Sequence, residues 1–322
     1  LPSLHHHELF YQMCKNSGVY VQIINFSMLG KKSMITQEHE KLDYLEELKR
    51  VECNERNFDE LQKYFKKSNL LENLTNTLLK PGKTKKEIIK SAIEYSLNSD
   101  TTNAKTHYTY YGRTKFKVFK HYVKDYFLTK FRQSYINKNL ETKLPSSEKF
   151  VFFPLHVEIE RSLLIAAPFY TNQIEVIRSI AKALPINYKL YVKEHPGQIQ
   201  RTWRSKSEYE QIMNIPNVVL LHPNVSNEVI YEKCELVITI AGSSGFEALF
   251  YRKPVITFRD MYYSILPSVR SFESFEKLSE QIKESKSEII DSSDLDKFVS
   301  LIEKNVLNFD LLDFTRRIKK EF

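Results

Sequence analysis

The pattern of apolar and polar positions changes near residue 149. Downstream of it, short apolar runs alternate with amphipathic segments of helical period. The runs predict strands at residues 150–155, 188–192, 218–221, 236–240 and 255–258, and the segments between them predict helices at residues 170–184, 206–213, 227–234 and 245–251. This alternation is typical of βαβ units whose parallel sheet is buried on both faces. We therefore expect an α/β fold with a Rossmann-type, doubly wound parallel sheet over residues 149–275.

The pattern upstream is different. Residues 1–148 show helical periodicity and few strand signals, and the segment VYVQIINF (19–26) is the one strand expected there, after a helix that ends near Gly18. Further helices are expected at residues 37–48, 57–65, 83–97 and 113–131. We divide the chain into a helix-rich N-terminal domain (1–148), the sheet domain (149–275) and C-terminal helices (276–322) that pack back across both.

Length and composition narrow the class of protein. A chain of 322 residues suits two domains, and its hydrophobic content of 42% is enough for buried cores. No apolar stretch is long enough to cross a membrane, and no signal peptide is expected after Leu1. The cysteines Cys14, Cys53 and Cys234 are far apart and form no CxxC motif. We expect a protein of the reducing cytoplasm.

A glycine–serine turn, AGSSG (241–245), follows the expected strand 236–240. Ligands of open α/β sheets bind at the carboxyl ends of strands, and a helix start offers free N–H groups to an anion. Small residues and the hydroxyls of Ser243 and Ser244 would suit a phosphate, and Glu247 could accept a hydrogen bond from a ribose hydroxyl. A second interpretation stays open, in which Ser244 and Glu247 form a capping box.

A His-Pro dipeptide stands at the end of another expected strand, in KEHPG (193–197). His195 could donate to a phosphate, Lys193 could add positive charge, and Pro196 fixes the local backbone. We expect this strand to neighbour the strand of the serine turn, so that both motifs meet at one edge. A second pair, His222-Pro223, is more simply interpreted as a turn.

Together, KEHP (193–196) and AGSSGFEALFYRKPVITF (241–258) resemble the HP motif and the serine motif of bacterial capsule polysaccharide glycosyltransferases of the GT-B fold, which include Kdo transferases and polysialyltransferases. The resemblance covers roughly residues 150–265. It implies a nucleotide-sugar donor, often a CMP-sugar, and inverting transfer to a surface polysaccharide or glycolipid without a metal or other cofactor. The resemblance implies that His195, Ser243 and Ser244 surround the donor phosphate. With the other residues of the two motifs and of the loop after the first strand, the expected donor-binding residues are Lys193, His195, Pro196, Gly242, Ser243, Ser244, Glu247 and Arg161.

Inverting transfer needs a base that takes a proton from the acceptor hydroxyl. The loop PLHVEIERS (154–162) offers Glu158 and Glu160, and the expected first helix offers the histidines 5–7 and Glu8. We take His7, Glu8 and Glu158 as the candidate catalytic residues. Arg161 in the same loop could bind a phosphate or a sugar carboxylate. A solvated interdomain loop with internal ion pairs is the alternative.

One part of the GT-B pattern is not met, because the resemblance implies a second parallel sheet in the acceptor domain. The sequence shows one strand before residue 149. Either strands upstream of Leu1 belong to the protein, and the base could then lie among them, or the acceptor domain is reduced and helical.

Most of the net charge of +8 comes from residues 112–138, where aromatic residues recur at helical spacing among lysines. A helix of this kind suits an anionic membrane surface, so we expect a cytoplasmic protein that associates peripherally with the inner face of the membrane. Aromatic packing against the protein core is the alternative, and nucleic acid is not an expected partner.

Two other functions stay open. One is an enzyme like the UDP-sugar 2-epimerases, which would need acid and base groups on both walls of the cleft. The other is a non-catalytic nucleotide-sugar-binding subunit of a capsule synthesis complex.

Overall fold

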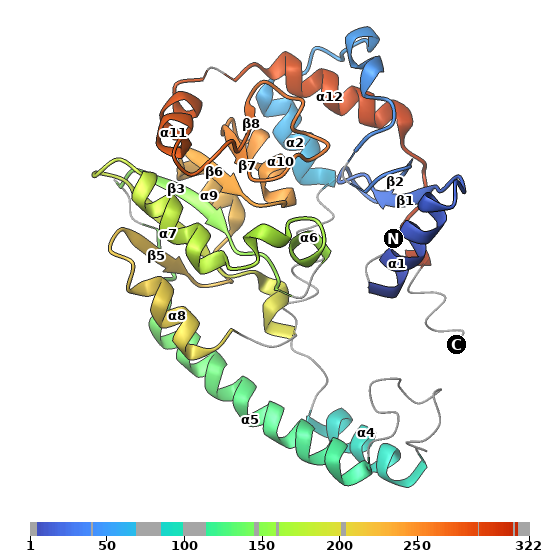
Figure 1. Cartoon of the computed structure of the whole chain (residues 1–322), viewed down its shortest axis with the longest axis vertical. Helices are drawn as coiled ribbons and strands as arrows, with labels where there is room; N and C mark the ends of the chain where they lie inside the picture. The colour runs from blue at the N-terminus through green and yellow to red at the C-terminus, as the bar shows by residue number, and fades with distance from the viewer. Residues whose placement is uncertain are drawn as a thin grey trace.

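The centre of the molecule is a six-stranded parallel sheet with the strand order β5-β4-β3-β6-β7-β8 (Figure 1). The computed structural model describes residues 5–39, 41–68, 85–98, 114–144, 148–158, 161–200, 204–288, 290–311 and 313–314. The strands are β3 (Phe150–Pro154), β4 (Lys189–Lys193), β5 (Val218–Leu221), β6 (Leu236–Thr239), β7 (Val255–Thr257) and β8 (Val269–Ser271). The predicted doubly wound α/β sheet is confirmed, and β8 is an addition at its edge.

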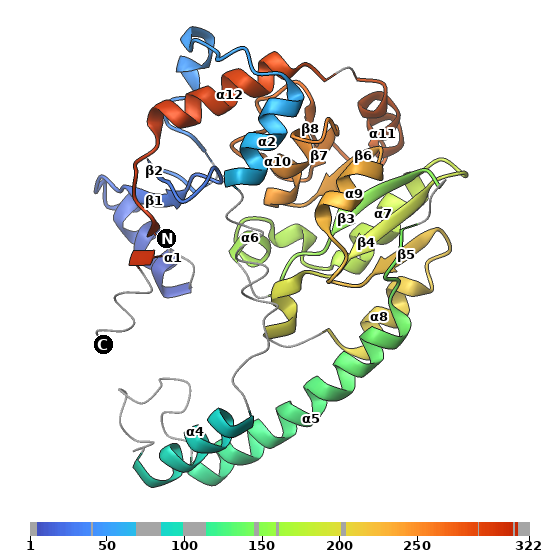
Figure 2. The ribbon, with the colours of Figure 1, turned by 180° about the vertical axis from the view of Figure 1, so that it is seen from behind.

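Helices cover both faces of this sheet (Figure 2). One face carries α7 (Gln173–Ala183), α8 (Lys206–Met213) and α11 (Leu278–Lys286), and the other carries α9 (Asn227–Lys233), α10 (Ser243–Leu249) and α12 (Ser292–Asn305). Successive side chains of β3 alternate between the two layers, with Val151 and Phe153 in one core and Phe150 and Phe152 in the other. All four are buried, which explains why the strand reads as a continuous apolar run.

The position of β3 corrects one expectation. The strand of the His-Pro motif, β4, and the strand of the serine turn, β6, are not neighbours, because β3 lies between them and pairs with both. The chain winds outward from β3 in one direction through β4 and β5, and in the other through β6 and β7. The edge above β3 and β6 is therefore a topological switch point, where ligands of such sheets bind.

The N-terminal segment differs from its prediction. After α1 (His5–Asn16), the expected strand 19–26 forms only at β1 (Ile23–Phe26), and it pairs antiparallel with an unpredicted strand, β2 (Ser33–Thr36). The prediction of a helix at residues 37–48 is wrong. The Asp43 carboxylate accepts the Gln37 N–H at 3.0 Å and holds a turn there, so that only a 3-10 helix, η1 (Leu45–Arg50), forms.

The next helix, α2 (Phe58–Ser68), packs on the helices of the sheet, where Phe65 stacks on Phe250 with 4.3 Å between the ring centroids. Arg56 just before it forms an ion pair with the buried Asp296 of α12. Residues on both sides of the proposed boundary at residue 148 therefore share one core. The three-part division of the chain stays a prediction.

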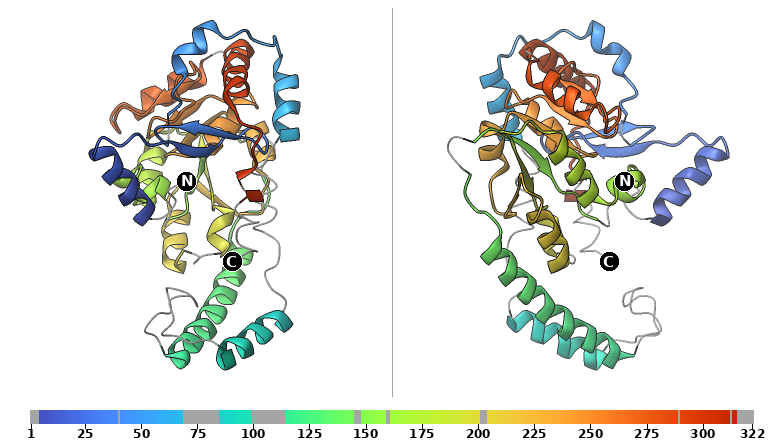
Figure 3. Two further views of the ribbon diagram at one scale, coloured as in Figure 1. Left: turned by 90° about the vertical axis from the view of Figure 1, so that its right-hand side faces the viewer. Right: turned by 60° about the vertical axis from the view of Figure 1, so that its left-hand side comes forward.

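Two helices extend away from the sheet (Figures 1 and 3). The predicted helix 113–131 forms as α5 (Lys115–Asn139), and α4 (Lys85–Asn98) lies beside its first half. Only the C-terminal end of α5 packs on the core of the sheet, through Ile136. Within the described parts of the chain, no helix combines the length and the apolar character needed to cross a membrane.

Candidate functional site

A cavity of about 250 Å³ lies at the carboxyl edge of the sheet. The ends of β3, β4 and β5, the start of α9, the serine turn and α2 all contribute to its wall. His195 and Pro196 of the His-Pro motif line it, and so do Ser243 and Ser244. The two motifs thus face one cavity although β3 separates their strands.

The two glycines of the serine turn are required by close packing. A Cβ atom on Gly242 would lie 2.8 Å from the Thr239 Oγ1, and one on Gly245 would lie 2.4 Å from the Tyr263 hydroxyl. That hydroxyl donates a hydrogen bond to the Gly242 carbonyl at 2.5 Å. The backbone of the turn therefore packs closely against β6 and Tyr263. Its side chains Ser243 and Ser244 line the cavity.

A buried polar cluster forms the floor. Ser243 Oγ donates to Glu247 at 3.2 Å, and the Tyr231 hydroxyl donates to the other carboxylate oxygen at 3.2 Å. Burial raises the pKa of Glu247, and these two hydrogen bonds partly offset that rise. The carboxylate predicted to accept from a ribose thus accepts from protein hydroxyls. Each of its two oxygens keeps further acceptor capacity, so a ribose hydroxyl in the cavity could still donate to Glu247.

Lys193 stands beside this cluster at the end of β4. Its side chain is buried, and its ammonium group donates to Asn227 Oδ1. Burial lowers the pKa of Lys193 to about 8, with the charge of Glu247 acting in the opposite direction. Lys193 is therefore charged at neutral pH, but it is close to its titration range.

Both His-Pro motifs form the same turn. Nδ1 of His195 accepts the Gly197 N–H at 3.0 Å, and Nδ1 of His222 accepts the Asn224 N–H at 3.1 Å. In the neutral ring the proton must then be on Nε2. His195 is among the residues that line the cavity, whereas the Nε2 of His222 lies 3.0 Å from Asn137 of α5.

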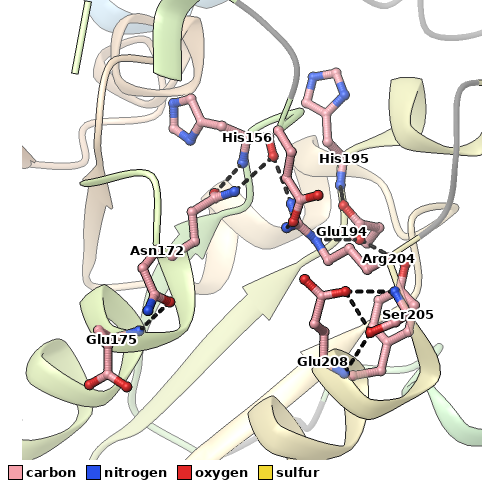
Figure 4. Close-up of polar contacts among 11 residues, drawn as sticks. His156, Asn172, Glu175, Glu194, His195, Arg204, Ser205 and Glu208 are labelled. Carbon is pink, nitrogen blue, oxygen red and sulfur yellow. Dashed lines mark hydrogen bonds and ion pairs between the residues drawn. The ribbon is translucent and has the colours of Figure 1, made fainter. Parts of the chain in front are cut away.

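A buried network of ion pairs and hydrogen bonds holds the His-Pro loop in place (Figure 4). Arg204 Nε binds Glu194 at 2.9 Å, the Tyr209 hydroxyl donates to the same oxygen at 2.8 Å, and the other oxygen of Glu194 accepts the His195 N–H at 2.7 Å. Glu194 is fully buried and Arg204 is 4% exposed. Arg204 was not among the predicted site residues, because nothing in the sequence TWRS (202–205) indicates contacts that form only in the folded chain.

His156, which follows β3, connects the two motifs. Gln173 of α7 accepts its N–H at 2.7 Å and donates to its carbonyl at 3.0 Å, and Arg204 donates to the same carbonyl at 2.7 Å. Its Nε2 accepts the Ala241 N–H of the serine turn at 3.2 Å. Figure 4 shows the rings of His156 and His195 projecting on the same side of their loops.

The candidate bases and Arg161 lie outside the lining of this cavity. Arg161 Nε binds Glu8 at 2.9 Å, which joins α1 to α6 (Arg161–Leu164). Burial would raise the pKa of Glu8, but the hydrogen bonds from Gln12 and Arg161 outweigh it and hold that pKa below its ordinary value. His7 is exposed on α1.

Glu158 forms an ion pair with Arg204 and is half-buried. Burial raises its pKa, although the charge of Arg204 opposes the rise. Glu160 and the side chain of His5 lie outside the described residues.

The profile of a family described as capsule polysaccharide biosynthesis protein matches residues 62–284, which is more than half of the chain. Among solved structures, the chain is similar to the KpsC β-Kdo 2,7-transferase of Thermosulfurimonas dismutans, with 17% identity, a TM-score of 0.33, and coverage of 49% of this chain and 52% of that one. It is also similar to the UDP-GlcNAc 2-epimerase of Methanocaldococcus jannaschii, with 14% identity, a TM-score of 0.36 and coverage of 53% and 49%. The matched parts span about half the length of those proteins. No curated protein sequence matches this chain.

Proposed function

The chain belongs to the family of capsule polysaccharide biosynthesis proteins, and from that premise we propose that it is a glycosyltransferase. It moves a sugar from a nucleotide-sugar donor, with a CMP-sugar favoured, to a surface polysaccharide or glycolipid acceptor. The observation that carries the proposal is that both motifs line one cavity at the switch point of the sheet, through His195, Ser243 and Ser244.

The donor phosphate binds between the His-Pro loop and the serine turn. His195 offers its Nε2–H, Ser244 offers a hydroxyl, and Lys193 supplies positive charge. Ser243 already donates to Glu247, so it exchanges that bond when a phosphate arrives.

These residues stabilise the leaving nucleotide in an inverting displacement. The acceptor oxygen attacks the anomeric carbon, the bond from that carbon to the phosphate oxygen breaks, and the nucleotide leaves with the electron pair. Donors placed where negative charge develops on the phosphate lower the barrier. The acceptor proton passes to a base, and we propose Glu158, because it lies two residues after His156, which binds the serine turn, and burial raises its pKa. Glu8 is less suited because Arg161 and Gln12 hold it as a carboxylate of low basicity.

The surface of α5 supports association with an anionic membrane. Its aromatic side chains are unusually exposed, with Phe116 at 74%, Phe127 at 66% and Phe131 at 61%. Lys120 and Lys124 are exposed on the same helix. Aromatic rings next to lysines suit the headgroup region of a bilayer. We place the protein on the inner face of the membrane, where a glycolipid acceptor is accessible.

Nucleotide-dependent thermal stabilisation tests the proposal. A ligand at ~100 times its dissociation constant should raise the free energy of unfolding by about 2.7 kcal/mol. We expect CMP to raise the melting temperature more than UDP, and a CMP-sugar to be consumed only when an acceptor glycan is present. Release of a free epimerised sugar from a UDP-sugar would favour the epimerase alternative. Binding of a nucleotide-sugar without turnover would favour the non-catalytic subunit, and no response to any nucleotide would reject the donor site.

A further inference from the structure

One cation of the cavity wall comes from the N-terminal part of the chain. Lys66, near the end of α2, lines the cavity together with Phe65. Phe65 is 2% exposed and stacks on Phe250, which directly follows α10. The ion pair of Arg56 with Asp296 fixes the chain just before α2. The backbone of Lys66 is therefore anchored on the layer of helices that carries the serine turn.

The ammonium group of Lys66 is held less firmly than the backbone of this residue. It forms an ion pair with Glu228 of α9 and lies 5.7 Å from the ring centroid of Tyr251. The side chains of Lys66 and Glu228 are 40% and 39% exposed. An ion pair at this exposure contributes little to stability, because solvent screens it and both side chains lose conformational freedom. A ligand anion in the cavity can therefore replace Glu228 as the partner of Lys66 at small cost.

The two lysines that line the cavity, Lys66 and Lys193, bind to consecutive residues of α9. Lys193 donates to Asn227, and Lys66 pairs with Glu228, the next residue of α9. One cation thus lies at the buried floor and the other on the more exposed wall. A ligand with one anionic group can engage only one of them closely, whereas a ligand with two anionic groups along its length can engage both.

We propose that Lys66 is a specificity-determining residue that binds a second anionic group of the donor, beyond the phosphate at His195 and Ser244. This rests on the proposed donor site. The second group is either the distal phosphate of a nucleoside diphosphate or the carboxylate of a sugar acid linked to a nucleoside monophosphate. Both would meet an ammonium group that already binds a carboxylate, that of Glu228.

Calorimetric titration of matched ligands tests the proposal. CMP and CDP share a base and differ by one phosphate, and CMP-N-acetylneuraminate adds a sugar carboxylate to CMP. The wild-type protein should bind one of the two larger ligands about tenfold more tightly than CMP, as expected for one charge-assisted hydrogen bond. Lys66→Met should abolish that preference, so that the variant binds CMP and the preferred larger ligand with equal affinity. Whichever ligand loses affinity identifies the source of the second anion.

Two further variants serve as controls. Lys67→Met removes an equal charge from the adjacent exposed position of α2, which does not line the cavity, and should retain the preference. Glu228→Gln removes the competing carboxylate and should preserve or increase the preference for the larger ligand. Equal preferences in the wild type and Lys66→Met would overturn the role of Lys66 alone. Absence of any nucleotide binding by the wild type would overturn the donor site as well.

Discussion

The imidazole of His156 accepts a hydrogen bond from the backbone N–H of Ala241, with 3.2 Å between Nε2 and the nitrogen. This contact joins the end of β3 to the serine turn after β6. The same residue is bound through its backbone by Gln173 and Arg204. His156 therefore positions the serine turn relative to the His-Pro loop, which Arg204 also supports through Glu194.

His156 should make the fold sensitive to acid. Burial, together with the nearby His195 and Arg204, lowers its pKa from 6.5 to about 4. Between these two pH values the unfolded chain binds a proton that the folded chain does not, so the free energy of unfolding falls as the pH falls from 6.5 to 4, by roughly 3 kcal/mol. His156→Gln cannot titrate, and chemical denaturation should show a shallower pH dependence in this window. A variant with the same slope as the wild type would contradict this assignment.

Arg204→Met should destabilise the protein strongly. It leaves Glu194, which is fully buried, without its cation, and loss of one partner of a buried pair costs about 3–5 kcal/mol. Arg178→Met is the control, because the pair of Arg178 with Glu175 is exposed and should contribute no more than about 1 kcal/mol. Urea denaturation of the two variants provides the comparison. Similar losses in both would show that the His-Pro loop does not depend on Arg204.

Gly245→Ala should disturb the serine turn through Tyr263. The added Cβ would lie 2.4 Å from the tyrosine hydroxyl, and such overpacking costs about 1–3 kcal/mol. Adding Tyr263→Phe removes the clashing oxygen and should recover part of the loss in melting temperature, although it also removes the bond to Gly242. If the double variant is as unstable as the sum of the two single variants, the clash is not the cause.

The exposed face of α5 should bind anionic vesicles. Vesicles of phosphatidylcholine with added phosphatidylglycerol should bind the protein in a salt-sensitive way, and neutral vesicles should bind it weakly. Reversing the charge of Lys120 and Lys124 should reduce binding at least about tenfold, since each basic residue near the surface contributes about 1 kcal/mol.

Reversal of Lys182 on α7, which lies on the sheet body, is the matched control. Salt-insensitive flotation, or self-association of the protein without vesicles, would show that another partner covers this face.

The strands of the sheet could be predicted because a strand buried on both faces must be apolar throughout, as Phe150 to Phe153 are. The carboxyl-edge location of KEHP and AGSSG followed from the ends of those strands. The order of the strands could not be predicted, because the placement of β3 between β4 and β6 depends on packing across the whole sheet. Arg204 was missed for a similar reason, since its partners Glu194, Glu158 and His156 come together only in the folded chain.

The prediction of a helix at residues 37–48 failed because local hydrogen bonding to Asp43 competes with helix formation. Charged side chains occur along the whole of residues 37–48, so they do not indicate where the turn forms. The short strand β2 was missed because its four residues pair only with β1 and with Leu307, near the other end of the described chain.

The most direct test of the donor site compares the two His-Pro turns. An asparagine can accept the N–H two residues ahead, as both histidines do, but it lacks the distal ring N–H. His195→Asn and His222→Asn should therefore both fold. The affinity for CMP, measured by calorimetry, should fall about 10–100-fold in His195→Asn alone. Equal affinities of His195→Asn and the wild type would contradict the placement of the donor phosphate at this edge of the sheet.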